Sequence, residues 1–216
     1  MLKMDIWLST AYLAPIQYYS KMLCADKVWI ERYDNYEKQT YRNRCTILSA
    51  NGPIALSIPV EHPQTQKSHT KDIRIADHGN WRHIHWNALV SAYNSTPFFE
   101  YYRDDFQPLY EKKYTFLIDF NDELHSLISS LIGFDKTPLV SYTDSYKESF
   151  FCDEYDFRSA IHPKKKWEIA DPGFASVPYY QVFEQRFGFV PNLSIVDLLF
   201  NMGNESLLIL SECCQK

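Results

Sequence analysis

The chain has few glycines, and it lacks the patterns that mark common cofactor sites. Its 216 residues include 6 glycines, which are too scattered to cradle a phosphate chain. No GxGxxG follows an expected strand, and no P-loop, HExxH, GxSxG or EF-hand pattern occurs. A standard nucleotide-binding fold is therefore disfavoured, and the sequence leaves the cofactor undetermined.

The chain also lacks a basic balance and long apolar runs. It has 22 Lys and Arg against 27 Asp and Glu, a formal net charge of −5. This charge does not suit binding to a phosphate backbone, so nucleic acid is not expected as a partner. The one basic run, Lys164-Lys165-Lys166, fits either a solvated face or an anion contact. No stretch approaches the roughly 20 apolar residues that span a bilayer, and Asp5 interrupts the N-terminal apolar residues. We expect a cytoplasmic protein without a membrane span.

Cysteine is sparse and unpatterned. The count of 5 is odd and no CxxC occurs, which argues against a disulfide framework and a zinc ribbon, so we expect reduced thiols. Cys24 or Cys45 would be a nucleophile if His85 lay within hydrogen-bond reach, and otherwise each is a small buried hydrophobe. The vicinal pair Cys213-Cys214 is expected at a frayed terminus.

Aromatic residues, by contrast, are abundant: Trp 5, Tyr 16 and Phe 14 make up 16% of the chain. Tyrosine has an apolar body and a polar hydroxyl, so it suits cores, clefts and interfaces. The hydrophobic fraction of 45% and the charged fraction of 23% are those of a globular protein. The length and composition predict a single domain over residues 1–216.

The pattern along the chain places strands early and helices late. Asn51-Gly52 marks the turn of a hairpin over residues 40–60. The expected strands are 6–12, 28–33, the two arms of that hairpin, 73–75 and 139–142. The expected helices begin at Pro15, at 81 after an Asn80 cap, at Pro97, at 121 with Gly133 as its stop, at 181 and at 194 with a Ser194 cap, whereas 144–178 has little regularity. This order predicts an α/β or α+β fold, with a mixed sheet built mainly from the N-terminal third and packed by helices from the C-terminal two thirds.

Two arginines form the most informative pair. At strand spacing, Arg42 and Arg44 project from one face, where bidentate hydrogen bonds suit a carboxylate, phosphate or diphosphate. The alternative is a solvent-facing pair neutralised by local acids such as Glu31 or Asp34. Asn43 lies on the opposite strand face, and it binds substrate only if that face also lines the cleft.

Histidine provides the candidate acid or base. His83 and His85 diverge on a helix, so they cannot share a metal. His85 follows Trp81 by one turn, which fits a hydrogen-bonded core histidine or a catalytic one. His62, His69 and His78 lie in or beside a polar loop. Their spacing is not diagnostic of a metal site, and we predict none.

The sequence resembles the WbqC-like protein family over nearly the whole chain. The residues that carry the resemblance are 9–19 (STAYLAPIQYY), 26–30 (DKVWI), 41–47 (YRNRCTI), 59–60, 81–85 (WRHIH) through Tyr93, 97–99, 181–183, 187–189 and 193–201. Many members end the first strand in a His-Gln-Pro type of sequence. This chain has Ser9-Thr10-Ala11 there, so the role of that histidine does not carry over.

The resemblance implies a role in making surface polysaccharide of the O-antigen type, with acyl or aminoacyl transfer to an activated amino sugar. On this hypothesis a transferase-like enzyme binds a small molecule such as a nucleotide-sugar. Arg42, Asn43 and Arg44 would bind substrate, His85 would act as acid or base, and Tyr93, two turns on, would be its hydrogen-bond partner. The alternatives are a non-catalytic sugar- or peptide-binding module and a scaffold protein that forms a homodimer through the tyrosine-rich helix at 98–110.

Overall fold

The computed structural model describes residues 4–61, 68–134 and 138–214, and its centre is a parallel sheet. The four strands are β1 (Asp5–Ser9), β2 (Lys27–Glu31), β5 (Leu139–Tyr142) and β6 (Glu154–Asp156), in the order β5-β2-β1-β6. Every neighbouring pair runs parallel. The carboxyl ends of all four strands therefore meet at one edge, which positions the candidate site.

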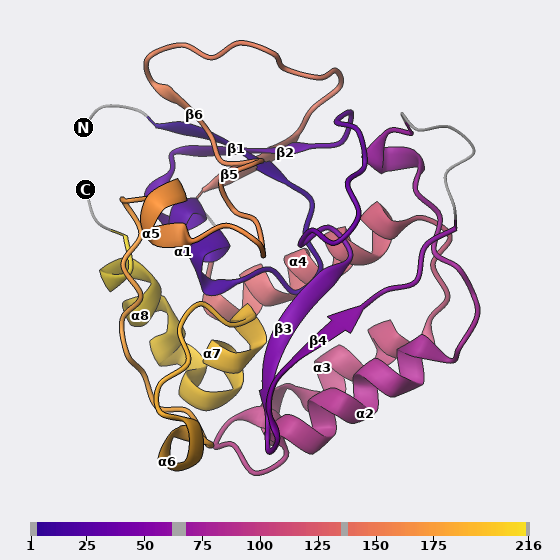
Figure 1. The fold of residues 1–216 in the computed structure, drawn as a ribbon, viewed down its shortest axis with the longest axis vertical. Coiled ribbons are helices and arrows are strands. Elements are labelled where there is room, and N and C mark those ends of the chain that lie inside the picture. The colour runs from indigo at the N-terminus through magenta and orange to yellow at the C-terminus, as the bar shows by residue number, and fades with distance from the viewer. Residues whose placement is uncertain (1–3, 62–67, 135–137, 215–216) are drawn as a thin grey trace.

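The two faces of this sheet are covered differently. Alternation turns the apolar side chains of β1 and β2, among them Leu8 and Ile30, into a core covered by helices (Figure 1). On the opposite face Trp7 and Trp29 stack with ring centroids 5.8 Å apart. Phe150 packs edge-on against Trp7 at 5.2 Å. The segment between β5 and β6 thus covers this face with irregular chain.

A separate antiparallel hairpin packs among the helices. It pairs β3 (Arg44–Ser49) with β4 (Gly52–Ser57). Gly52 has a φ of 105°, a left-handed conformation that glycine adopts without strain. The hairpin predicted from Asn51-Gly52 is confirmed.

Helices fill the rest of the molecule and bury most of the aromatic residues. The helical elements are α1 (Ile16–Cys24), η1 (Thr70–Asp72), α2 (Trp81–Tyr93), α3 (Phe99–Glu111), α4 (Leu117–Ile132), α5 (Trp167–Ala170), α6 (Glu184–Phe187), α7 (Ile195–Met202), η2 (Gly203–Glu205) and α8 (Ser206–Glu212). In Figure 1, α1 and α4 lie beneath the parallel sheet, while α2 packs against β3 of the hairpin and α3 packs against α2. Phe99, Phe106 and Tyr110 of α3 are buried within the chain, whereas Tyr101 is 78% exposed. Within the described ranges no helix combines the length and apolarity needed to cross a membrane.

The α/β class is confirmed, and several local predictions need correction. Residues 144–178, expected to be irregular, contain β6, whose three residues show no strand pattern of their own. The segment 73–75 forms isolated bridges instead of a strand. Neither expected cap makes its side-chain bond: Asn80 is left-handed with a φ of 47°, and the Ser194 hydroxyl donates to the Leu13 carbonyl at 2.7 Å.

The cysteine prediction was wrong in one respect. Cys24 and Cys214 are disulfide-bonded with their Cα atoms 6.7 Å apart, and the bond joins the end of α1 to the residues after α8. Cys214 is therefore not incidental, and Cys24 is not a free nucleophile. The sequence could not reveal the pairing because 190 positions separate the two residues.

Candidate functional site

A cleft of about 450 Å³ opens at the carboxyl edge of the parallel sheet. In open α/β sheets, ligands bind outside the carboxyl ends of the strands. Its lining comes from the segments that follow β2, β5 and β6, together with the turn before β3 and the residue before η1: Tyr33, Asp34, Asn35, Glu37, Arg42, His69, Tyr146, Asp156, Arg158 and Ser159.

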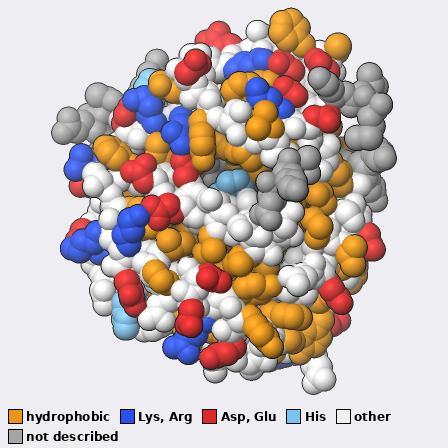
Figure 2. Space-filling view, turned by 180° about the vertical axis from the view of Figure 1, so that it is seen from behind, with side chains coloured by type: hydrophobic (Ala, Val, Ile, Leu, Met, Phe, Trp, Pro, Cys, Tyr) orange, Lys and Arg blue, Asp and Glu red, His pale blue; other side chains and the backbone are white. Residues whose placement is uncertain are grey.

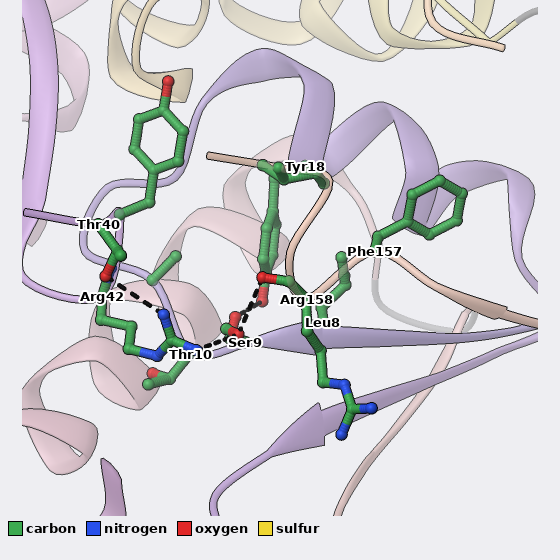
Figure 3. Close-up of a pocket in the computed structure, with 11 residues that line it drawn as sticks. Leu8, Ser9, Thr10, Tyr18, Thr40, Arg42, Phe157 and Arg158 are labelled. Carbon is green, nitrogen blue, oxygen red and sulfur yellow. Dashed lines mark hydrogen bonds between the residues drawn. The ribbon is translucent and has the colours of Figure 1, made fainter. Parts of the chain in front are cut away.

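Arg42 forms the inner wall of the cleft. The residue is 6% exposed, and its guanidinium pairs with the Asp34 carboxylate. It also donates to the Ser9 hydroxyl at 3.0 Å and to the Thr40 hydroxyl at 3.3 Å (Figure 3). The Nε–H of Arg42 is buried and has no hydrogen-bond partner among the described residues. A buried donor without a partner costs free energy, so the close packing around this guanidinium comes at the expense of one hydrogen bond.

Asp34 connects the cleft to η1. One carboxylate oxygen binds Arg42, and the other accepts from the Thr70 hydroxyl. The Thr70 backbone N–H also donates to the Asp34 carbonyl at 2.9 Å. These bonds hold η1 and the end of β2 together, so the position of Arg42 is fixed by two separate elements.

Arg158 forms a second ion-paired wall. It donates to Glu31 at 2.8 Å and to both oxygens of Asp156 at 2.9 Å. A fourth bond reaches the Lys147 carbonyl at 2.9 Å. Glu31 is 0% exposed, so Arg158 neutralises a fully buried carboxylate. With four bonds made, Arg158 has less capacity for a ligand than Arg42.

His69 and two tyrosines complete the cleft. The His69 Nδ1 lies 2.6 Å from the Tyr33 carbonyl oxygen. A carbonyl only accepts hydrogen bonds, so Nδ1 carries the proton and the neutral ring keeps its lone pair on Nε2. Tyr33 and Tyr146 add aromatic walls, and the guanidinium of Arg158 lies 4.6 Å from the centroid of the Tyr146 ring. A base, carboxylates and aromatic planes thus share one cleft.

Of the three predicted substrate-binding residues, the structure brings Arg42 to this cleft. β3 begins at Arg44, so strand alternation does not govern Arg42, and the two arginines do not share a strand face. Arg44 is not among the residues that line the cleft. The amide of Asn43 donates to the Ile58 carbonyl at 2.8 Å and ties the hairpin together.

The predicted catalytic pair lies in the core. His85 is 4% exposed, and its Nδ1 lies 2.9 Å from the Tyr12 hydroxyl. Burial lowers the pKa of His85 to about 4, so the ring is neutral at neutral pH. Tyr93 is 0% exposed and donates to Asp197 at 2.9 Å. The structure does not bring His85 and Tyr93 to the carboxyl-edge cleft.

The remaining candidates that the structure describes do not line the cleft. Cys45 is buried, and burial raises the pKa of its thiol well above the usual value, which disfavours the thiolate. His83 is exposed on α2, and its Nε2 lies 2.8 Å from the Asn87 amide nitrogen. His62 lies outside the described residues. In the part of the chain that the structure describes, no three His, Cys, Asp or Glu residues are placed to hold a metal ion.

Sequence reasoning missed most of the cleft. Glu31 and Asp34 were considered only as partners for an arginine pair, and His69 only as a member of a polar loop. One available signal was a polar residue at the last position of a buried parallel strand, as at Ser9 of β1 and Glu31 of β2. Asp156 and Arg158 offered no such signal, because β6 was not recognisable.

Comparisons with known proteins agree with the resemblance in sequence. The model of the WbqC-like protein family matches residues 10–150, more than half of the chain. That segment contains Asp34, Arg42 and His69, whereas Asp156 and Arg158 follow its end. The uncharacterized protein Rv1507c of Mycobacterium tuberculosis is 27% identical over 205 residues, which cover 85% of this chain and 87% of that protein. No solved structure matches. The chain belongs to the WbqC-like protein family.

Proposed function

We propose that this protein is a transferase-like enzyme of surface polysaccharide synthesis of the O-antigen type, and that its acceptor is an activated amino sugar bound in the carboxyl-edge cleft. The observation that carries the proposal is the cleft itself, with its ion-paired arginines, its carboxylates and its aromatic walls. Hydroxyl groups, an amine and a flat ring face are the ligand features that such a lining recognises.

The charges in the cleft favour the sugar over a diphosphate. Three carboxylates, those of Asp34, Glu37 and Asp156, face two guanidiniums, and both guanidiniums are already ion-paired. A diphosphate here would be repelled by the carboxylates. A protonated amine would be attracted, most directly by Glu37, whose side chain is 68% exposed. The sugar therefore occupies the cleft, and the activating group extends out of it.

His69 supplies the base for the transfer. The bound ammonium first gives one proton to Nε2 of His69, which leaves the nitrogen with a lone pair that attacks the carbonyl carbon of an acyl or aminoacyl donor. The donor's leaving group departs with the electron pair of the broken bond and takes up the second proton that the nitrogen releases, and an amide forms. His69 is available because its proton is held on Nδ1 by the Tyr33 carbonyl.

Binding tests the amine recognition. Calorimetric titration with uridine-diphosphate-linked glucosamine, glucose and N-acetylglucosamine compares an amine, a hydroxyl and an amide on one scaffold. We expect the amine to bind most tightly, and we expect Glu37→Gln to weaken it about tenfold, the size of one charge-assisted hydrogen bond. Asp104→Asn, an exposed carboxylate on α3, is the matched control. Equal affinity for all three ligands would refute the assignment.

Turnover tests the base. With a bound amino sugar and a panel of acyl thioester and aminoacyl donors, His69→Gln should lose at least a hundredfold in rate while keeping its affinity for the sugar. His83→Gln, the exposed histidine of α2, should keep both. If the wild-type protein binds amino sugars but transfers no group from any donor, the non-catalytic sugar-binding module becomes the better description.

A further inference from the structure

A second cavity of about 310 Å³ lies between α4 and the edge strand β5. It shares no lining residue with the carboxyl-edge cleft, and we call it the serine groove. Its lining residues are His125, Ser126, Ser129, Ser130, Phe134, Val140 and Tyr142.

The local sequence explains how the serine groove forms. Ser126, Ser129 and Ser130 are three and four residues apart, so their hydroxyls share one face of α4. Gly133 ends the helix in a left-handed conformation, and the Phe134 backbone N–H turns back to the Ser129 carbonyl at 2.8 Å. This places Phe134 at the end of the groove.

The described residues that line the serine groove carry no formal charge. Among them there is no Asp, Glu, Lys or Arg. Its one titratable base, His125, lies 3.3 Å from the Tyr19 hydroxyl through Nδ1 and 3.5 Å from the Ser129 hydroxyl through Nε2. Burial lowers the pKa of His125 to about 4, so the ring is neutral at neutral pH. A phosphate or an ammonium group would find no opposite charge in this lining.

Tyr142 gives the serine groove a fixed aromatic plane. The guanidinium of Arg32 lies 3.6 Å from the centroid of the Tyr142 ring, and Arg32 is itself held by Asp122. The Tyr142 side chain remains 41% exposed. An aromatic ring that is held in place and partly exposed is suited to stack against the apolar face of a sugar.

A second, much smaller space lies behind His125. It has a volume of about 10 Å³, enough for one water-sized group, and its lining includes Thr10, Asn121 and the carboxylate of Asp122, which is ion-paired with Arg32. Asn121 is 1% exposed, and its amide donates to the Thr10 hydroxyl at 3.1 Å and to the Arg42 carbonyl at 2.8 Å. Its Oδ1 has no partner among the described residues. One water in this space would satisfy the buried acceptor.

We infer that the serine groove is a binding site for a neutral pyranose ring, separate from the charged cleft. Its hydroxyls and neutral imidazole exchange hydrogen bonds with sugar hydroxyls, and Tyr142 stacks on the ring. A volume of about 310 Å³ is at the small end of ligand pockets, which suits a single ring. The inference does not rest on the transferase chemistry proposed above.

Saturation-transfer NMR with the full chain tests the site. The probes are methyl α-glucopyranoside and methyl α-rhamnopyranoside, with glucosamine and galacturonic acid as charged comparisons. We expect the neutral glycosides to bind at millimolar concentrations, Tyr142→Ala to weaken them at least tenfold and Tyr142→Phe to retain them. Tyr180→Ala, an exposed tyrosine outside the groove at 51% exposure, is the matched control.

Three results would overturn the inference: no neutral glycoside binds, Tyr142→Ala weakens the charged sugars as much as the neutral ones, or Tyr142→Ala leaves the binding of the neutral glycosides unchanged. If Tyr142→Ala does not fold by circular dichroism, the double variant Ser126→Ala, Ser130→Ala replaces it, with an expected loss of several-fold. His69→Gln should bind the glycosides as the wild type does. A failure of the transferase assay therefore leaves this result standing.

Discussion

Protonation of His85 should destabilise the fold, and replacing this residue measures by how much. The ring lies between Tyr12 and the backbone of Ser57, both of which hydrogen-bond it, and Trp81 packs edge-on at 5.2 Å. A proton on Nδ1 would break the bond that this nitrogen accepts from the Tyr12 hydroxyl. It would also place a positive charge in the aromatic core.

The size of the effect follows from the pKa of His85. It is about 4 in the fold against 6.5 for an unperturbed histidine, so between these values the unfolded chain binds more protons than the fold. Stability is therefore lost as the pH falls from 6.5 toward 4. The full shift corresponds to about 3 kcal/mol, of which about 2 kcal/mol falls between pH 7 and pH 4.5.

Other buried groups also titrate in this pH range, so the pH dependence of the wild type alone does not measure the contribution of His85. His125 has its pKa lowered to about 4 and adds to the effect of His85. Burial raises the pKa of Asp122 and of Asp197 to about 6, which has the opposite sign: stability is lost as the pH rises from 4 to 6. In the wild type, the contributions of the histidines and of the aspartates to the pH dependence of stability therefore partly cancel. The difference between wild type and His85→Gln isolates one group.

Urea unfolding at pH 7.0 and pH 4.5 measures that difference. At pH 7.0, His85→Gln should be less stable than the wild type by about 1–3 kcal/mol, because it loses two buried hydrogen bonds and their packing. At pH 4.5 the difference in unfolding free energy between wild type and His85→Gln should be smaller by about 2 kcal/mol. His83→Gln, on the exposed face of the same helix, should match the wild type at both pH values. If the difference in unfolding free energy between wild type and His85→Gln does not change with pH, His85 is not held neutral. If His85→Gln loses turnover at unchanged stability, the predicted catalytic role of His85 is supported instead.

Three further predictions concern the core and the ends of the chain. Burial raises the pKa of Asp197 to about 6, so the wild type should lose about 3 kcal/mol of unfolding free energy through this group as the pH rises from 4 through 6. Asp197→Asn should not show this loss, and urea unfolding that gives the variant the same pH dependence as the wild type would contradict the prediction. Cys24→Ser should lower the unfolding free energy by up to about 5 kcal/mol, because its bond closes a loop of 190 residues, whereas Cys152→Ser, an exposed free thiol, should not; peptide mapping without reductant that finds Cys24 free would refute the pairing. Arg158→Met should cost about 3–5 kcal/mol by leaving Glu31 buried without its partner, and adding Glu31→Leu should recover most of it; thermal melts of the two variants decide, and equal melting temperatures would argue against the pair.

Features set by neighbouring residues could be predicted from the sequence. Asn51-Gly52 fixed the hairpin turn, because the left-handed conformation required there is one that Gly52 adopts freely. Pro15 and Gly133 marked the start of α1 and the end of α4 for similar local reasons. The family resemblance was also carried by short segments and is confirmed over residues 10–150.

The candidate site was only partly predictable. Arg42 was identified for its chemistry, but its place in the cleft depends on where β3 begins, two residues later. His85 and Tyr93 have residue types that serve in catalysis as well as in cores, and only their burial separates the two roles. Local sequence cannot reveal burial that depends on distant helices.

Only the tertiary structure determined which strand ends come together. Parallel strands cannot be joined by tight turns, so residues that meet at their carboxyl edge come from distant parts of the chain. Arg158 and Glu31 are 127 positions apart, and β6 is too short to show a pattern before it pairs with β1. The sequence determined the hairpin, most of the longer helices and the chemical types available for a site. Long-range pairing, whose free energy depends on the whole core, decided which of those side chains face one cleft.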